Sequence, residues 1–386
     1  MATNKAQMSA QQMQQQNFLQ RNAVVANSIK MKQQIYSKSV DPASESTINI
    51  STNIRNAGLL LGFIVTVEAG LTNGSTTAAT RTPFGVANLV KEFRFDDLSN
   101  YTRIQCPGWY LAMLNSVRAR RLFGGAYDGQ LPIGFGNNYS VYSGPSSLAA
   151  DATGTAKMQY FVPISYSGTD LRGAMYMSTV SATTNLQINL NTTPFTDTGN
   201  PISYLYTGNS GGGYTGNVTV TVYQIYLDQI PRAQDGSPIL PMQDLNTVYD
   251  IKQTTFSTPT ANQDFPMPYS NFRSFLSTLA VFDNGGTYNT GSDVAYWALQ
   301  SANFTNIFKL PPDIVALEGR TAIMGDFPDG CYFFESRDTP INTINFGNME
   351  LLLNASTVNS NARVLVGYES FALVNQVAGA TSLGAG

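Results

Sequence analysis

Few side chains in this sequence could form the centre of an active site. Histidine is absent, which excludes Ser-His and Cys-His catalytic pairs and removes the commonest protein ligand of transition metals. The two cysteines, Cys106 and Cys331, are far apart in sequence and form no Cys-x-x-Cys pair. Two thiols alone make no zinc site, and they could be bridged only if the fold brought them together. We expect two reduced, partly buried thiols.

One glycine-containing stretch has the layout of a phosphate-binding loop between a strand and a helix. Leu276 to Asp293 reads LSTLAVFDNGGTYNTGSD, an apolar run followed by two glycines and a helix start at Ser292. A phosphate loop needs a lysine after its glycines, but none is near, and the charges of Asp283 and Asp293 would repel phosphate. The stretch is therefore interpreted as a hairpin turn at Asn284-Gly285.

Two pairs of neighbouring acidic residues could serve carboxylate chemistry or bind calcium: Asp96 with Asp97, and Asp326 with Asp329. Glycoside cleavage needs two carboxyl groups at a fixed separation across a cleft, and calcium sites usually gather more acidic residues in one loop. Aspartate also forms turns and caps without any further role. We interpret both pairs as turn formers and caps, and expect no catalytic residue, metal ligand or cofactor.

A cluster of arginines forms the only dense basic group outside the N-terminal segment. Arg118, Arg120 and Arg121 lie on an expected helix, 109–123, whose Met113 and Val117 would face inward. Such a cluster could contact nucleic acid phosphates. Because the rest of the chain is acidic and lacks an accompanying aromatic strand motif, a salt-bridged or subunit-facing cluster is favoured.

The elements that must position these residues are mostly strands. Charged residues make up only 12% of the chain, and the dominant apolar pattern has a period of two, which is typical of half-buried strands. Leu59, Leu61, Phe63, Val65 and Val67 would share one face, and similar runs occur at 93–95, 158–162, 186–190, 218–226, 332–334, 344–353 and 364–368. Many short strands separated by Asn-Gly and Asp-Gly turns indicate sandwiches or barrels.

The pattern repeats in two halves of the chain. Three prolines and a glycine mark a linker at 231–244, which separates a first sandwich at 46–230 from a second at 245–386. Each half has an early apolar strand, one helix and a closing strand, with the helices expected at 109–123 and 292–304. The longest apolar run, 57–67, is too short to span a membrane, and the N-terminus lacks the features of a secretory signal.

Residues 1–45 form a separate basic and glutamine-rich arm. Its cations precede the first acidic residue, Asp41, and are Lys5, Arg21, Lys30, Lys32 and Lys38. Phe18, Val25, Ile29 and Tyr36 fall near one helical stripe, and Asp41-Pro42 would end the helix. The arm could be a polar, partly disordered tail. The alternative is a basic helix that lies against a partner or an anionic membrane surface.

Several long segments resemble the tectivirus major capsid protein. They are spread over nearly the whole chain and comprise FGVANLV (84–90), FVPISYSGTDLRGA (161–174), VYQIYLDQIP (222–231), LSTLAVFDNGG (276–286), SANFTNIFKLPPD (301–313) and NARVLVGYE (361–369). Several collinear matches are far more specific than any single motif. The glycine-rich loop at 206–217 and the small-residue tail after Val377 depart from the family, which affects outer-surface features and C-terminal contacts.

The resemblance implies an all-β double jelly roll, two eight-stranded sandwiches in one chain, with an N-terminal helical arm. It further implies homotrimers that form pseudo-hexagonal capsomers of an icosahedral shell over an internal lipid membrane. The expected partners are neighbouring capsomers, penton and minor capsid proteins, and that membrane through the arm, without direct nucleic acid contact. The protein would be part of a bacteriophage virion assembled in the host cytoplasm, and the family has no catalytic residues.

An alternative of another class is a carbohydrate-binding or glycan-cleaving spike built from two β-sandwiches. Its basis is the tyrosine content, Trp109, Trp297 and the spare carboxylates, because aromatic faces and carboxylates are what a glycan site would need.

Overall fold

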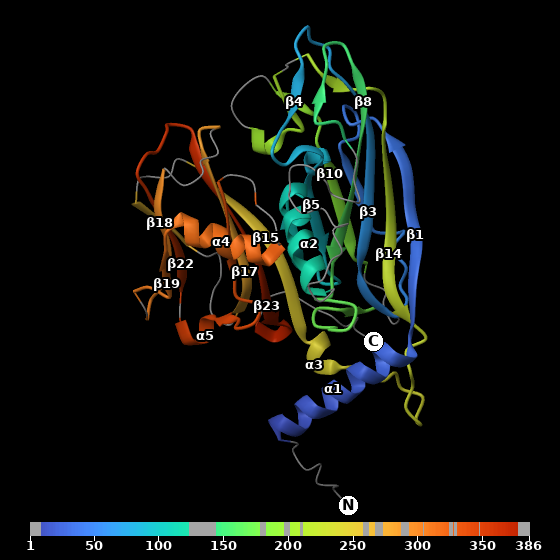
Figure 1. Ribbon diagram of the computed structural model, residues 1–386. Coiled ribbons are helices and arrows are strands. Elements are labelled where there is room, and N and C mark those ends of the chain that lie inside the picture. Colours follow the sequence, from blue (N-terminus) through green and yellow to red (C-terminus); the bar gives the residue numbers. More distant parts are fainter. Residues whose placement is uncertain are drawn as a thin grey trace, which may run out of the picture.

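Two β-sandwiches lie side by side in the computed structural model of the chain (Figure 1). The helix at 10–27 lies below the first sandwich, and the helices at 108–122 and 312–323 lie against the sheets. The structure describes residues 9–122, 144–177, 183–196, 201–208, 211–257, 262–266, 273–286, 293–303, 305–323, 327, 330–346 and 348–376.

A six-stranded antiparallel sheet forms the outer layer of the first sandwich. β14 lies between β1 and β3, and β3 also pairs with β8, β9 and β13. The bounds are β1 (Ile29–Val40), β3 (Leu59–Thr72), β8 (Thr153–Pro163), β9 (Met175–Tyr176), β13 (Gly213–Tyr214) and β14 (Val218–Asp228). A small sheet at one end of this sandwich consists of β4 (Ala79–Arg81), β7 (Ser147–Leu148), β11 (Phe195–Thr196) and β12 (Tyr206–Thr207).

A nine-stranded sheet runs from the first sandwich into the second. Its first-half strands are β2 (Thr47–Ile50), β10 (Asn185–Leu190), β5 (Val90–Asp96) and β6 (Thr102–Cys106). Its second-half strands are β15 (Thr247–Ser257), β23 (Ala362–Leu373), β17 (Arg273–Asn284), β20 (Cys331–Glu335) and β21 (Ile341–Asn342). The two groups join where β6 pairs with β15 in parallel, Ile104 beside Ile251. One hydrogen-bonded layer therefore connects both halves.

The second sandwich is completed by a four-stranded antiparallel sheet. It consists of β16 (Asn262–Pro266), β22 (Met349–Ala355), β18 (Val294–Ser301) and β19 (Phe308–Leu310). The core between the layers is aromatic: Trp297 is fully buried, and its ring lies 5.2 Å from that of Tyr332 on β20. Burial of such large apolar surfaces supplies most of the free energy that holds two sheets together.

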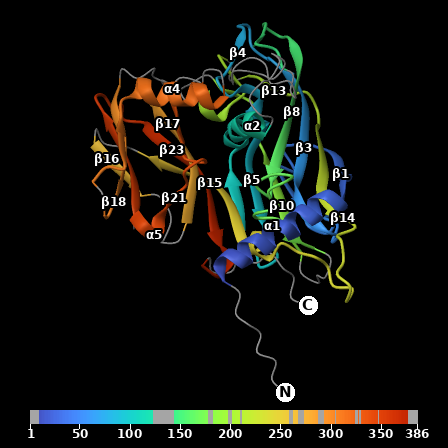
Figure 2. The same ribbon diagram turned by 60° about the horizontal axis from the view of Figure 1, so that its bottom comes forward.

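The helices pack between and below the sheets. α2 contacts β5 and β8, α4 contacts β20 and β18, and the two helices contact each other (Figure 2). The helices are α1 (Ala10–Asn27), α2 (Gly108–Leu122), α3 (Met242–Leu245), α4 (Pro312–Ile323) and α5 (Thr343–Phe346), with short 3-10 turns at Gly85–Leu89, Pro201–Ser203 and Val374–Gln376. The helix expected at 109–123 is thus confirmed as α2, and Phe123 lies outside the described residues.

The helix expected at 292–304 is wrong. Val294–Ser301 is strand β18, which pairs with β22 and β19 and buries Trp297 in the core. A register shift between Val294 and Tyr296 interrupts the alternation that marks a strand. The helix of the second half is α4, which begins at Pro312 and has Asp313 in its first turn. Both residues favour a helix N-terminus, since proline needs no amide partner there and a carboxylate suits the helix dipole.

The helix expected through the N-terminal arm is wrong in its second half. α1 ends at Asn27, and residues 29–40 form β1, which pairs with β14 over eleven positions from Ile29–Asp228 to Val40–Val218. Phe18 is exposed, and Val24, not Val25, is the fully buried residue. β1 supplies hydrogen-bond partners to the backbone groups along the edge of β14. The free energy of this pairing outweighs the weak helical pattern of apolar residues in the segment.

Two strand expectations need correction in detail. Leu61 is an extra residue in β3, because Leu60 pairs with Tyr226 and Gly62 with Ile225. This bulge moves side chains to the other face, so Leu59 and Leu61 pack in a separate cluster with Val24, while Phe63, Val65 and Val67 pack in the main core. In the run expected at 344–353, residues 343–346 form α5 and the strand begins only at Met349.

Candidate functional site

Helix α1 is attached to the base of the first sandwich by a buried polar contact. Asn17 Nδ2 donates to Asp244 Oδ1 at 2.8 Å, and Asn17 Oδ1 accepts from the Gln243 amide at 2.9 Å. Burial raises the pKa of Asp244, while the bond from Asn17 and the nearby charge of Arg21 limit the rise. Val24 adds an apolar contact by packing with leucines of β3 and β14. The helix is therefore docked on the body, with one face left toward solvent.

This end of the first sandwich carries exposed apolar side chains on adjoining elements. We call it the base surface, formed by Met13, Phe18, Leu19, Ile29, Met31 and Met242 on α1, the start of β1 and α3. Phe18 is 51% exposed and Leu19 60% exposed. Figure 2 shows α1 lying across this end of the molecule. Several large exposed apolar side chains on one surface are typical of an interaction site.

The cations predicted for the arm differ in their surroundings. Arg21 Nη1 lies 3.4 Å from Asp244 and 3.7 Å from Asp170, and Lys38 Nζ lies 2.6 Å from Glu45. Lys30 and Lys32 are exposed on β1, and no ion pair to either is present in the part of the chain that the structure describes. Lys5 lies outside the described residues. The structure thus places these two lysines at the start of β1, where they alternate with Ile29 and Met31 of the base surface.

The other sequence-predicted sites are structural where they are described. Asp283 Oδ1 accepts from the Gly286 amide at 2.7 Å, and both Gly285 and Gly286 have positive φ, as expected for a turn after β17. Asp97 is buried; it accepts from the Ser99 amide and pairs with Arg103 at 3.1 Å. Asp326 and Asp329 lie outside the described residues. Both cysteines are buried and form no disulfide.

A buried charge network between the halves was not found by sequence reasoning. Glu369 on β23 is fully buried and accepts from Arg337 Nη2 at 2.6 Å, from Ser277 Oγ at 2.9 Å and from the Tyr249 hydroxyl. Arg118 on α2 donates to Tyr249 and lies 3.8 Å from Glu369. Arg118 is thus salt-bridged as predicted, whereas nothing is described of the side chains of its two neighbours. No local spacing relates these positions, because only the fold brings them together.

The network has no group poised for proton transfer near neutral pH. Burial alone would raise the pKa of Glu369, but Arg337 and Arg118 outweigh it and hold that pKa below its usual range. Burial raises the pKa values of Tyr249 and Cys106. Within the described ranges, no three acidic or thiol side chains gather closely enough to hold a metal ion. The described helices include none long and apolar enough to cross a membrane.

The comparisons with known proteins decide the family. The profile described as "P3 major capsid protein N-terminal" matches residues 1–230, and "P3 major capsid protein C-terminal" matches residues 246–384. This chain belongs to the P3 major capsid protein family. The major capsid protein P3 of Enterobacteria phage PRD1 is 37% identical to it over 372 residues, which cover 95% of this chain and 93% of that protein. The tectivirus resemblance is thereby confirmed.

Solved structures show that this P3 family member has the double jelly roll fold. The crystal structure of the STIV MCP, from Sulfolobus Turreted Icosahedral Virus, has a TM-score of 0.63 at 14% identity and covers 91% of this chain and 99% of its own. The PBCV-1 virus capsid has a TM-score of 0.55 at 11% identity, with 89% and 94% covered. The chain is a viral major capsid protein, a structural component of the capsid.

The carbohydrate-binding or glycan-cleaving alternative finds no support. Trp109 is 4% exposed and Trp297 is fully buried, so neither ring offers a face to a sugar. Both pack against other aromatic rings, Trp109 on Phe84 and Trp297 on Tyr332. They are core residues of the two sandwiches.

Proposed function

We propose that three copies of this capsid protein form a pseudo-hexagonal capsomer of an icosahedral shell. The observation that carries this proposal is the single nine-stranded sheet that fixes two similar sandwiches side by side in each chain. Three such chains around a three-fold axis present six similar lobes, which can tile a shell with quasi-hexagonal contacts. The corresponding partners are neighbouring capsomers and the penton and minor capsid proteins, and assembly takes place in the host cytoplasm.

The trimer is tested by light scattering on the purified full chain. A particle of three times 41.8 kDa is expected, with its mass unchanged on moderate dilution because obligate oligomers bury large surfaces. A 41.8 kDa monomer at every concentration would contradict the proposal. In this organisation 1–45 is the N-terminal arm, of which 29–40 joins the sheet of the first jelly roll as β1. The two jelly rolls are 46–230 and 245–386, and 231–244 connects them.

We further propose that the base surface faces the internal membrane of the virion. Phe18 and Leu19 expose apolar area, and Lys30 and Lys32 add positive charge beside it. Each lysine near an anionic lipid surface contributes about 1 kcal/mol, and salt screens this attraction. Several arms on one capsomer would bind far more tightly than one. With lipid between shell and genome, the acidic body needs no contact with nucleic acid.

Vesicle binding tests the membrane contact. The double substitution Lys30→Ser and Lys32→Ser is expected to weaken sedimentation of the trimer with phosphatidylserine vesicles at low salt, and to leave neutral vesicles unaffected. The matched control is Lys157→Ser, because this lysine lies on β8 and is paired with Glu68 at 3.0 Å. Equal binding by the double variant and the control would refute the role of these lysines.

A further inference from the structure

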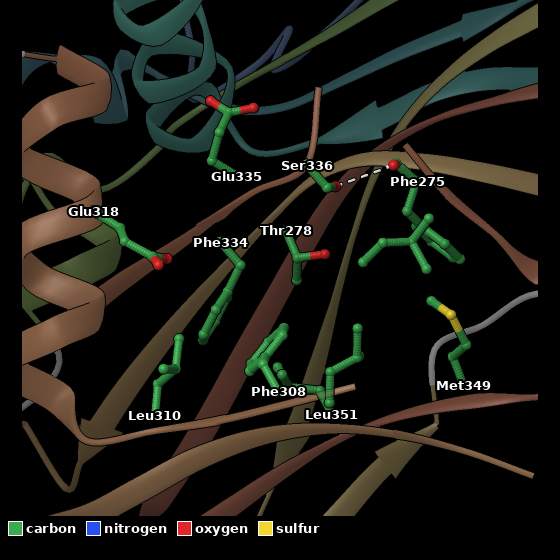
Figure 3. A pocket seen from close by; sticks show the side chains of 12 residues that line it. Phe275, Thr278, Phe308, Leu310, Glu318, Phe334, Glu335, Ser336, Met349 and Leu351 are labelled. Carbon is green, nitrogen blue, oxygen red and sulfur yellow. Dashed lines mark hydrogen bonds between the residues drawn. The ribbon is translucent and has the colours of Figure 1, made fainter. Parts of the chain in front are cut away.

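A cavity of about 140 Å³ lies inside the second sandwich. It is placed between β17, β20 and β21 of the nine-stranded sheet and β18, β19 and β22 of the facing sheet, with α4 at its side (Figure 3). Its inner wall is apolar and buried, since Phe275, Met349 and Leu351 are at most 2% exposed. Phe308 and Leu310 on the edge strand β19 are half-buried and form the side nearer to solvent.

The cavity has few polar lining residues, and those that carry a charge are all acidic. Of the twelve lining residues none is basic, and the two charged residues are Glu318 and Glu335. Glu335 is already engaged, because its carboxylate lies 3.5 Å from Arg337. Glu318 reaches from α4 toward the cavity (Figure 3), and its carboxylate has no ion pair in the described part of the chain. Partial burial raises its pKa.

We propose that this cavity binds a small amphiphilic cation, a short alkylammonium whose apolar chain enters between the sheets and whose ammonium group pairs with the Glu318 carboxylate. The apolar wall recognises the chain, and the uncompensated carboxylate at the α4 side selects a positive head group over a neutral or negative one. The Thr278 hydroxyl also lines the cavity and offers a second oxygen to a donor.

The size of the cavity limits the ligand to a short chain. An apolar protein cavity of about 150 Å³ accommodates one benzene molecule, so about 140 Å³ holds five or six carbon atoms and excludes the full acyl chain of a lipid. The head group need not be desolvated completely, because Glu318 lies on an exposed turn of α4. A primary amine with a linear six-carbon chain meets both requirements.

Titration of the full chain with three matched probes tests the proposal. Hexylammonium is expected to bind saturably, without displacing an existing ion pair. Hexan-1-ol should bind more weakly, and hexanoate should not bind. Glu318→Gln keeps the shape of the side chain and removes only its charge. Because an exposed ion pair contributes less than about 1 kcal/mol, the substitution should lower the affinity for hexylammonium about two- to fivefold and leave that for hexanol unchanged.

A second variant separates the cavity from the carboxylate. Leu310→Trp would fill the cavity from its solvent side and should abolish binding of both hexylammonium and hexanol. The trimer mass and the thermal unfolding transition show whether this variant still folds. Absence of saturable hexylammonium binding to the unsubstituted chain would overturn the proposal. So would hexanoate binding as tightly as hexylammonium, or an affinity that neither variant changes.

Discussion

Replacing Glu369 with glutamine should destabilise the protein far more than any surface charge change. The carboxylate is fully buried and is shared by Arg337 and Arg118, which approach it from opposite halves of the chain. Glutamine keeps one acceptor oxygen but turns an amide toward the donors, which leaves the buried Arg118 guanidinium without its carboxylate and Arg337 with Glu335 alone. Breaking one side of a buried ion pair typically costs about 3–5 kcal/mol, so we expect a loss of that size.

Denaturant unfolding at a fixed protein concentration measures this loss, since oligomer stability depends on concentration. The matched control is Glu68→Gln, which removes a surface carboxylate that is 48% exposed and paired with Lys157; its cost should stay below about 1 kcal/mol. Adding Arg118→Met to Glu369→Gln should restore part of the stability, because the buried charge that has lost its carboxylate partner is then removed. A difference between the two single variants below about 1 kcal/mol would refute the reasoning.

Three further predictions concern the contact of α1 with α3, the buried thiol of Cys106 and the close packing at Gly367. Asn17→Ala should remove the bonds to Asp244 Oδ1 and the Gln243 amide and leave the Asp244 carboxylate with Arg21 alone. Amide exchange in α1 should therefore quicken by an amount worth about 1–3 kcal/mol, whereas an exposed glutamine of the same helix should be replaceable without effect. Burial raises the pKa of Cys106, so above about pH 8.5 the folded chain keeps a proton that the unfolded thiol loses. The contribution of this thiol to stability is therefore complete below about pH 8.5 and should fall by up to about 1.4 kcal/mol per pH unit above it. Cys106→Val should reduce this slope. Gly367→Ala should cost about 1–3 kcal/mol in the same unfolding assay, because its Cβ would lie 2.3 Å from the buried ring of Tyr110, while Gly213→Ala meets no atom within 4 Å and should be nearly neutral.

The strands with strict alternation could be predicted from the sequence because their burial depends on one face alone. Val218, Val220 and Val222 all lie inward on β14, as their spacing indicates. The helix at α2 was equally accessible, since Gly108 follows Pro107 and a helical apolar pattern begins at once. In such segments local pattern and tertiary packing favour the same structure.

The errors arise where a distant partner decides the local structure. Residues 29–40 become a strand because β14 needs an edge partner, and nothing in their own composition requires it. The bulge at Leu61 and the shift near Tyr296 interrupt alternation in ways that a period-two pattern does not foresee. The contact of Arg118 with Glu369 joins positions in different halves. The family resemblance predicted the double jelly roll, which the sequence pattern alone had left as sandwiches or barrels, but it did not foresee β1, the bulge or this contact.

The parallel pairing of β6 with β15 has a mechanical consequence for a closed shell. β6 and β15 pair at two positions, Ile104 with Ile251 and Gln105 with Lys252, and a buried charge network braces the same seam, so we expect each subunit to move as one unit rather than as a hinged pair. Any bending that a spherical container demands must then be taken up at the joints between neighbouring molecules. The subunit itself stays flat, and the contacts between subunits supply the curvature of the shell.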